Sequence, residues 1–206
     1  KKRFAAIDVL KGIGILLVIL GHSVPDYPIN LRADVVAANL ESIIYGFHMP
    51  LFFVSAGFVW QIADNGRISI NWLNKKAQRL LVPYITFSFV SLTLRLLFSA
   101  FTRSSVDIWE GIYGIILEGK YFWFLYVMFM ILAMIEVLKT IKINLKWQYF
   151  IALIFYLIGI FVKSPFLCLN RFGYYFLFTL LGITVYNNKP MIDKLFSKWY
   201  TPWIMI

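Results

Sequence analysis

The sequence has few of the polar residues that cover the surface of a soluble protein. Of its 206 residues, 15% are charged and 61% are hydrophobic, and the mean hydropathy is +0.75. Soluble domains carry about 25% charged and about 45–50% apolar residues. The chain therefore has too little polar surface for a water-facing globule, and a soluble domain is excluded.

Cysteine and histidine are also scarce. Cys168 is the single cysteine, so the chain cannot form an internal disulfide. His22 and His48 are the two histidines, and the sequence places no cluster of metal ligands around them. Because metal sites usually need three or four ligands, we expect no bound metal. Two imidazoles in neighbouring apolar segments instead favour acid/base chemistry.

Acidic residues are few, with 10 Asp and Glu against 20 Lys and Arg, for a net charge of +10. Such an excess is typical of proteins that bind nucleic acid or a membrane. Fourteen of the basic residues fall in alternate connections between apolar stretches, within residues 1–11, 67–79, 139–146 and 189–198. Since cytoplasmic loops retain Lys and Arg, this pattern predicts a cytoplasmic N-terminus and no nucleic-acid partner.

Six stretches of 14 to 22 residues contain no charged residue. A spanning helix needs about 20 mostly apolar residues, and flanking Lys and Arg side chains can reach the headgroups to complete a span. We therefore predict an all-α, polytopic transmembrane helix bundle with about six complete spanning helices and the start of a seventh. The expected helices are 8–25, 40–62, 80–101, 120–138, 147–163 and 171–187, and a seventh begins within 199–206.

The first predicted helix contains three ionisable residues that are costly in hydrocarbon. Asp8 and Lys11 are three residues apart and can pair on one face of the helix. His22 follows Lys11 by 11 residues, which is about 16.5 Å along a helix and nearly the same face. Lys11 is either part of a site or an anchor at the cytoplasmic interface, and His22 is either a site residue or an interfacial one.

The second predicted helix places His48 two residues before Pro50. A proline bends a helix and frees a backbone carbonyl group, and membranes tolerate this where neighbouring groups or a cavity satisfy the backbone. His48 is therefore either an acid/base residue or a hydrogen-bonding group between packed helices.

Further candidates lie around the third and fourth predicted helices. Lys76 and Arg79 end the expected loop 65–79, where they either contact lipid headgroups or anchor a phosphate-rich cosubstrate. Arg95, within the third helix, either lines a cavity or extends to the interface. Trp123 is typical of the aromatic belt at a membrane interface.

Four motifs built from these residues resemble the membrane acyltransferase family called acyltransferase type 3, and within it the fucose 4-O-acetylases and other sugar O-acetyltransferases. The stretch from Lys11 to His22 resembles the family's signature of a basic residue, ten others and a histidine. The other three motifs are Phe47–Phe53 with Ser55–Gly57, Lys76–Arg79, which resembles an R-x-x-R loop, and Lys120–Leu125, which resembles a Trp-Phe-Leu segment. Lys stands for Arg in two of them, which keeps the charge and loses the guanidinium fork.

The resemblance implies an O-acetyltransferase that moves an acetyl or other acyl group from acetyl-CoA to a carbohydrate hydroxyl. The acceptor is expected in a bacterial surface polysaccharide, such as O-antigen or exopolysaccharide, or in a glycolipid, and the location is the bacterial cytoplasmic membrane. Acetyl-CoA is then a cosubstrate, no cofactor is bound, and the partners are the acyl-CoA, a carbohydrate or lipid-linked sugar, and membrane lipids. The family's membrane domain has more helices, so residues 1–206 are expected to form a single domain that is incomplete at its C-terminus.

The implied site combines three groups of residues. His22 and His48 are the expected catalytic residues, since an alcohol needs a base to become a nucleophile. Lys11, Lys76, Arg79 and Arg95 are expected to bind the acyl-CoA. Asp8, Pro50 and Trp123 are expected to be structural residues near the site.

Two other classes of protein fit the same composition. The first is a transporter or flippase of a polysaccharide precursor, with His22, His48 and Arg95 along its path. Transporters tend to have internal repeats and paired broken helices, whereas this sequence has no evident repeat and one clear Pro-interrupted segment. The second is a membrane module of a sensor or fused enzyme that binds a ligand without catalysis.

Overall fold

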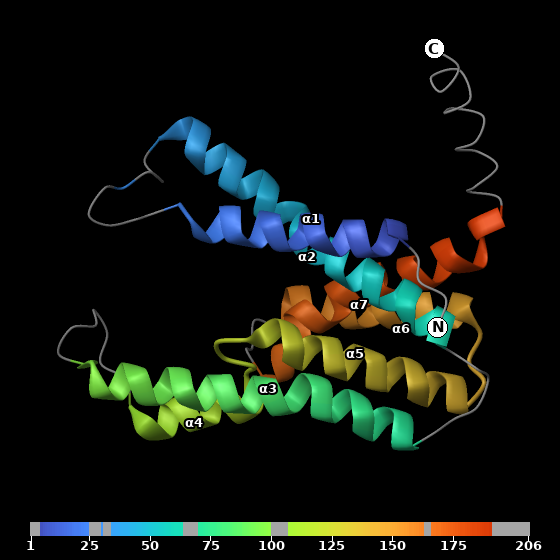
Figure 1. Cartoon of the computed structure of the whole chain (residues 1–206). Helices are drawn as coiled ribbons and strands as arrows, with labels where there is room; N and C mark the ends of the chain where they lie inside the picture. Colours follow the sequence, from blue (N-terminus) through green and yellow to red (C-terminus); the bar gives the residue numbers. More distant parts are fainter. Residues whose placement is uncertain are drawn as a thin grey trace, which may run out of the picture. The chain divides into compact units, whose positions relative to one another are not determined.

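The fold is helical throughout the part of the chain that the computed structural model describes, which is residues 5–24, 30, 34–63, 70–99, 107–162 and 166–190 (Figure 1). The prediction of an all-α helix bundle is confirmed. The helices are α1 (Ala5–His22), α2 (Val35–Ala63), α3 (Ile70–Leu97), α4 (Ile108–Leu117), α5 (Trp123–Thr140), α6 (Leu145–Phe161) and α7 (Leu169–Asn187), with a short 3-10 helix, η3 (Phe166–Cys168), before α7.

Four segments of the described chain are long and apolar enough to cross a membrane, judged by length and composition: Val35–Ala63, Asn71–Leu97, Trp123–Thr140 and Phe166–Asn187. α1 has 18 residues and α6 has 17, and neither is among these four. Helices nevertheless occupy all six predicted regions. The predicted start of a further span at 199–206 lies outside the described residues.

Two details of the predicted helices are wrong. α3 begins at Ile70, ten residues before the expected start, because Leu, Lys, Ala, Gln and Arg in this segment all favour a helix. α4 was not expected at all, since Glu110 interrupts the apolar pattern. The Asp107 carboxylate accepts a hydrogen bond from the Glu110 backbone N–H at 3.0 Å, which caps the first turn of this short helix.

The chain divides into two compact units, and α7 contributes to both. In the first unit, residues 1–64 and 178–206, α1 packs against α2 (Figure 1). The end of α7 approaches α2 so closely that a methyl group on Gly57 would overlap the Thr179 carbonyl oxygen, and one on Gly182 would overlap the Val54 carbonyl oxygen. Small residues let two helix backbones come together in this way in membranes.

In the second unit, residues 65–177, α4 and α5 run antiparallel to α3 (Figure 1). The Tyr84 hydroxyl of α3 donates a hydrogen bond to the Ile115 carbonyl oxygen of α4 at 2.5 Å, and its ring lies 5.4 Å from that of Tyr126 on α5. α6 contacts the beginning of α7 through the rings of Phe155 and Phe172, 5.1 Å apart. The polar phenol of Tyr84 thus gains a backbone partner inside an apolar core, as buried hydroxyl groups require.

We predict that Gly182→Ala destabilises the first unit, because the new methyl group would force α7 away from the α2 backbone. Overpacking of this kind costs about 1–3 kcal/mol. The measurement is the midpoint temperature of unfolding of the purified protein in detergent, compared with Gly12→Ala, where a methyl group meets nothing within 4 Å. Equal midpoints for the two variants would show that the close approach at Gly182 is not needed.

Candidate active site

His22 is the last residue of α1, where the chain leaves the helix. The Ser23 hydroxyl donates a hydrogen bond to the Ile19 carbonyl oxygen at 2.6 Å and satisfies one of the terminal carbonyl groups. The imidazole of His22 is exposed on the surface of the first unit. Its place at a helix end leaves the ring accessible to a substrate.

Tyr45 of α2 stands between the two histidines. Its hydroxyl oxygen lies 3.3 Å from Nδ1 of His22, and the centres of these two rings are 5.8 Å apart. On its other side, the Tyr45 ring meets the ring of His48 edge to face, with centres 5.1 Å apart. The packing of α1 against α2 thus brings His22 and His48 close together, with one phenol between them.

His48, unlike His22, is buried, with 3% of the residue exposed. Its Nδ1 lies 2.6 Å from the backbone carbonyl oxygen of Ile44. Since a carbonyl oxygen only accepts, Nδ1 must carry the proton and donate it, which leaves the lone pair of the neutral ring on Nε2. Pro50 is also buried within α2, one turn or less from His48.

Lys11 and Asp8 lie on the same helix as His22. The Lys11 side chain is half-buried and that of Asp8 is exposed, in the first two turns of α1. Eleven residues of helix place Lys11 about 16.5 Å from His22 along the axis. Lys11 therefore cannot contact the same small group as the imidazole, although an extended ligand can contact both.

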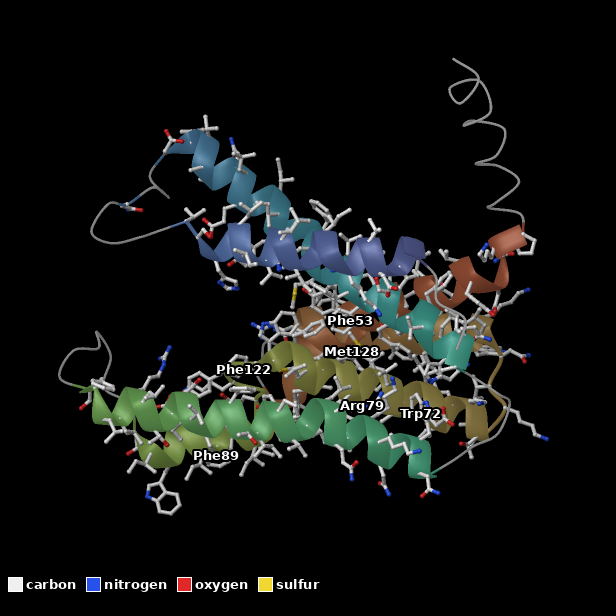
Figure 2. The ribbon with its side chains drawn as sticks, in the orientation of Figure 1. Phe53, Trp72, Arg79, Phe89, Phe122 and Met128 are labelled. Atoms are coloured by element: carbon white, nitrogen blue, oxygen red, sulfur yellow. The ribbon has the colours of Figure 1, made fainter. Side chains whose placement is uncertain are left out.

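Lys76 and Arg79 are in α3, not in a loop as the sequence analysis predicted. The two residues are three positions apart in the helix, so they lie about one turn apart on the same side. The Lys76 ammonium lies over the Trp72 ring, 5.3 Å from its centre. Trp72 and Arg79 occur in the first part of α3 (Figure 2). The Arg79 side chain is exposed and available to an anion.

Arg95 and Trp123 belong to a different part of the second unit. Arg95 lies in the last turn of α3, 16 residues after Arg79, which is about 24 Å along the helix. Its guanidinium lies over the Tyr121 ring at 5.2 Å. Trp123, at the start of α5, stacks on Tyr175 at 5.3 Å and has the Arg171 guanidinium over it at 4.5 Å.

Trp123 thus packs against residues of α7. Arg95 is too far from Lys76 and Arg79 for the three to bind one phosphate. Within the described residues, no group of three or more His, Cys, Asp and Glu side chains is placed to hold a metal ion.

Tyr45 is the residue that sequence reasoning missed. A weak signal was present, because Tyr45 precedes His48 by three residues and so lies one helical turn away on the same side. Its contact with His22 depends on the register between α1 and α2, which no spacing within one helix reveals.

Comparisons with known proteins add one match. The family model described as "Acyltransferase domain", acyltransferase type 3, matches residues 4–206. Searches of curated proteins and of solved structures found no match. The family model covers nearly the whole chain, including both histidines and the cations of α3. The protein therefore belongs to the acyltransferase type 3 family of membrane acyltransferases.

Proposed function

We propose that this membrane acyltransferase moves an acetyl group from acetyl-CoA to a hydroxyl group of a carbohydrate, in a surface polysaccharide or a glycolipid. The observation that supports it most is the pair of imidazoles joined by Tyr45, with His22 exposed. An alcohol needs a base before it attacks a thioester, and a neutral imidazole serves as that base near pH 7.

In the proposed reaction, Nε2 of His22 takes the proton of the acceptor hydroxyl. The hydroxyl oxygen then attacks the thioester carbonyl carbon, so that a C–O bond forms and the C–S bond breaks. The thiolate of coenzyme A leaves and takes the proton back from the imidazolium. The reaction as proposed needs no oxidant or metal, and His22 returns to its neutral form.

The exposure of the two histidines suggests different roles for them. His22 is exposed at the end of α1, so a sugar hydroxyl can reach it. His48 is almost fully buried, and its Nδ1 is used by the helix backbone. We therefore assign the contact with substrate to His22 and a supporting role in the same cluster to His48.

Lys76 and Arg79 are the proposed binding groups for the phosphates of acetyl-CoA. Arg79 is exposed, and the two cations lie one turn apart in α3. Phosphate groups form strong charge-assisted hydrogen bonds with such side chains. In the proposed orientation, with the N-terminus in the cytoplasm of a bacterium, these cations meet the donor on the side where acetyl-CoA is made, and Lys11 lies toward the same side.

The first test is His22→Ala. We expect transfer of radiolabelled acetyl from acetyl-CoA into the polysaccharide and glycolipid of membranes to fall by about 10²–10⁴-fold, the usual contribution of a general base. Ser42→Ala, which removes one hydroxyl that donates to the Ala38 carbonyl oxygen of α2, should keep full activity. The amount of membrane-inserted protein is measured for each variant.

Two outcomes would contradict the proposal. Retained transfer in His22→Ala would overturn the role of this histidine. If the unaltered protein inserts and moves a polysaccharide precursor across the membrane without transferring label, the transporter hypothesis would replace the acetyltransferase one.

The second test is the double variant Lys76→Ala with Arg79→Ala. Loss of two charged hydrogen-bond donors should raise KM for acetyl-CoA by about tenfold or more while kcat changes little, because phosphate binding is used equally in ground and transition states. Lys75→Ala removes one positive charge from the exposed position next to Lys76 and is the control. An unchanged KM in the double variant, or an equal rise in the control, would exclude the specific phosphate role.

A further inference from the structure

Tyr45 has a defined place next to His22. A methyl group on Gly21 would come within 3.1 Å of the Tyr45 ring, so the missing side chain of Gly21 gives this ring its room against α1. The hydroxyl oxygen then lies 3.3 Å from Nδ1 of His22, the residue that follows Gly21. The position of the phenol is thus fixed by helix packing as well as by its hydrogen bond.

The ring of Tyr45 is also held from the side of His48. The two rings meet edge to face, at 86° and 5.1 Å between centres. The His48 ring is itself held by its Nδ1–H bond to the Ile44 carbonyl oxygen. A buried, oriented ring therefore supports the plane of Tyr45, and through it the direction of the hydroxyl group.

The hydrogen bond at Nδ1 determines what Nε2 of His22 can do. A neutral imidazole carries one N–H, so only one of its nitrogens is basic. If the Tyr45 hydroxyl donates to Nδ1, the proton is on Nε2 and this atom cannot act as a base. If Nδ1–H donates to the Tyr45 oxygen, the lone pair is on Nε2, and a phenol oxygen can accept in this way.

We propose that Tyr45 is a positioning residue that accepts a hydrogen bond from Nδ1–H of His22 and so keeps Nε2 unprotonated and basic. This rests on the proposed role of His22 as the base. When Nε2 takes a proton from the acceptor hydroxyl, the ring becomes an imidazolium and its Nδ1–H bond to the phenol oxygen strengthens. The neutral phenol oxygen of Tyr45 thus orients the histidine, a role that a carboxylate has beside many catalytic histidines.

The tautomer can be observed directly because the chain contains only two histidines. In the full chain, labelled with ¹⁵N-histidine and reconstituted in lipid bilayers, solid-state NMR gives two sets of imidazole signals, and His22→Ala identifies which set belongs to residue 22. We expect a protonated Nδ1 and an unprotonated Nε2 for neutral His22. A protonated Nε2 with an unprotonated Nδ1 would overturn the proposal, whatever the activity.

The kinetic test uses Tyr45→Phe, which keeps the ring and removes the hydroxyl. We expect kcat to fall by about 10- to 100-fold, the effect of losing one hydrogen bond to a charged group, with KM for acetyl-CoA unchanged. The Nδ1–H signal of His22 should decrease in the same variant. Tyr113→Phe, at an exposed position of α4, is the matched control and should change neither quantity.

The outcomes separate the two proposals. Unchanged kcat and unchanged His22 signals in Tyr45→Phe would refute the positioning role while leaving His22 as the base. Conversely, the expected tautomer combined with full activity of His22→Ala would refute the catalytic role of His22 and leave the hydrogen bond as a structural contact. If Tyr45→Phe does not insert, the NMR of the unaltered protein still decides whether Tyr45 accepts or donates.

Discussion

The Tyr45 ring of α2 packs against α1 where Gly21 has no side chain, and a methyl group at Gly21 would crowd the ring. A buried polar group without a partner costs several kcal/mol, so the buried imidazole of His48 needs one. His48 finds one in the backbone of its own helix, at the Ile44 carbonyl oxygen, whereas His22 finds one across the helix pair, at Tyr45. The register of α1 against α2 therefore provides the partner of His22 and brings the two histidines together, and a shift of one residue along either helix would separate His22 from the Tyr45 hydroxyl.

The class of fold could be predicted because hydrocarbon imposes a simple rule on composition: long charge-free stretches between basic connections become helices. The rule locates apolar stretches but does not find helix ends. α3 starts at Ile70, inside the expected loop, because residues with charged side chains are good helix formers when a helix extends beyond the apolar core. The rule does not find α4, because this helix is only 10 residues long and contains the charged residue Glu110.

The candidate site could be predicted where it contains residue types that are rare in this chain. His22 and His48 are conspicuous in a sequence that is 61% hydrophobic, and their location on consecutive helices follows from their spacing. Tyr45 was not predictable in this way, because the chain has 12 tyrosines, and others, such as Tyr84 and Tyr126, pack against each other. What distinguishes Tyr45 is a contact between two helices, and contacts of this kind depend on rotation and register, which a single sequence does not contain.

The proposed chemistry does not require that the cations and the imidazoles come from one compact unit. Acetyl-CoA is long, with phosphates at one end and the reacting thioester at the other, so the groups that bind it and the group that reacts need not be neighbours. Lys76 and Arg79 lie in one compact unit and His22 in the other. Binding energy from phosphate contacts then adds to affinity, whereas the rate of transfer depends on the tautomer of His22 and on what holds it. In the proposed reaction these two properties are carried by different helices, and a change at Tyr45 should alter catalysis without altering donor binding.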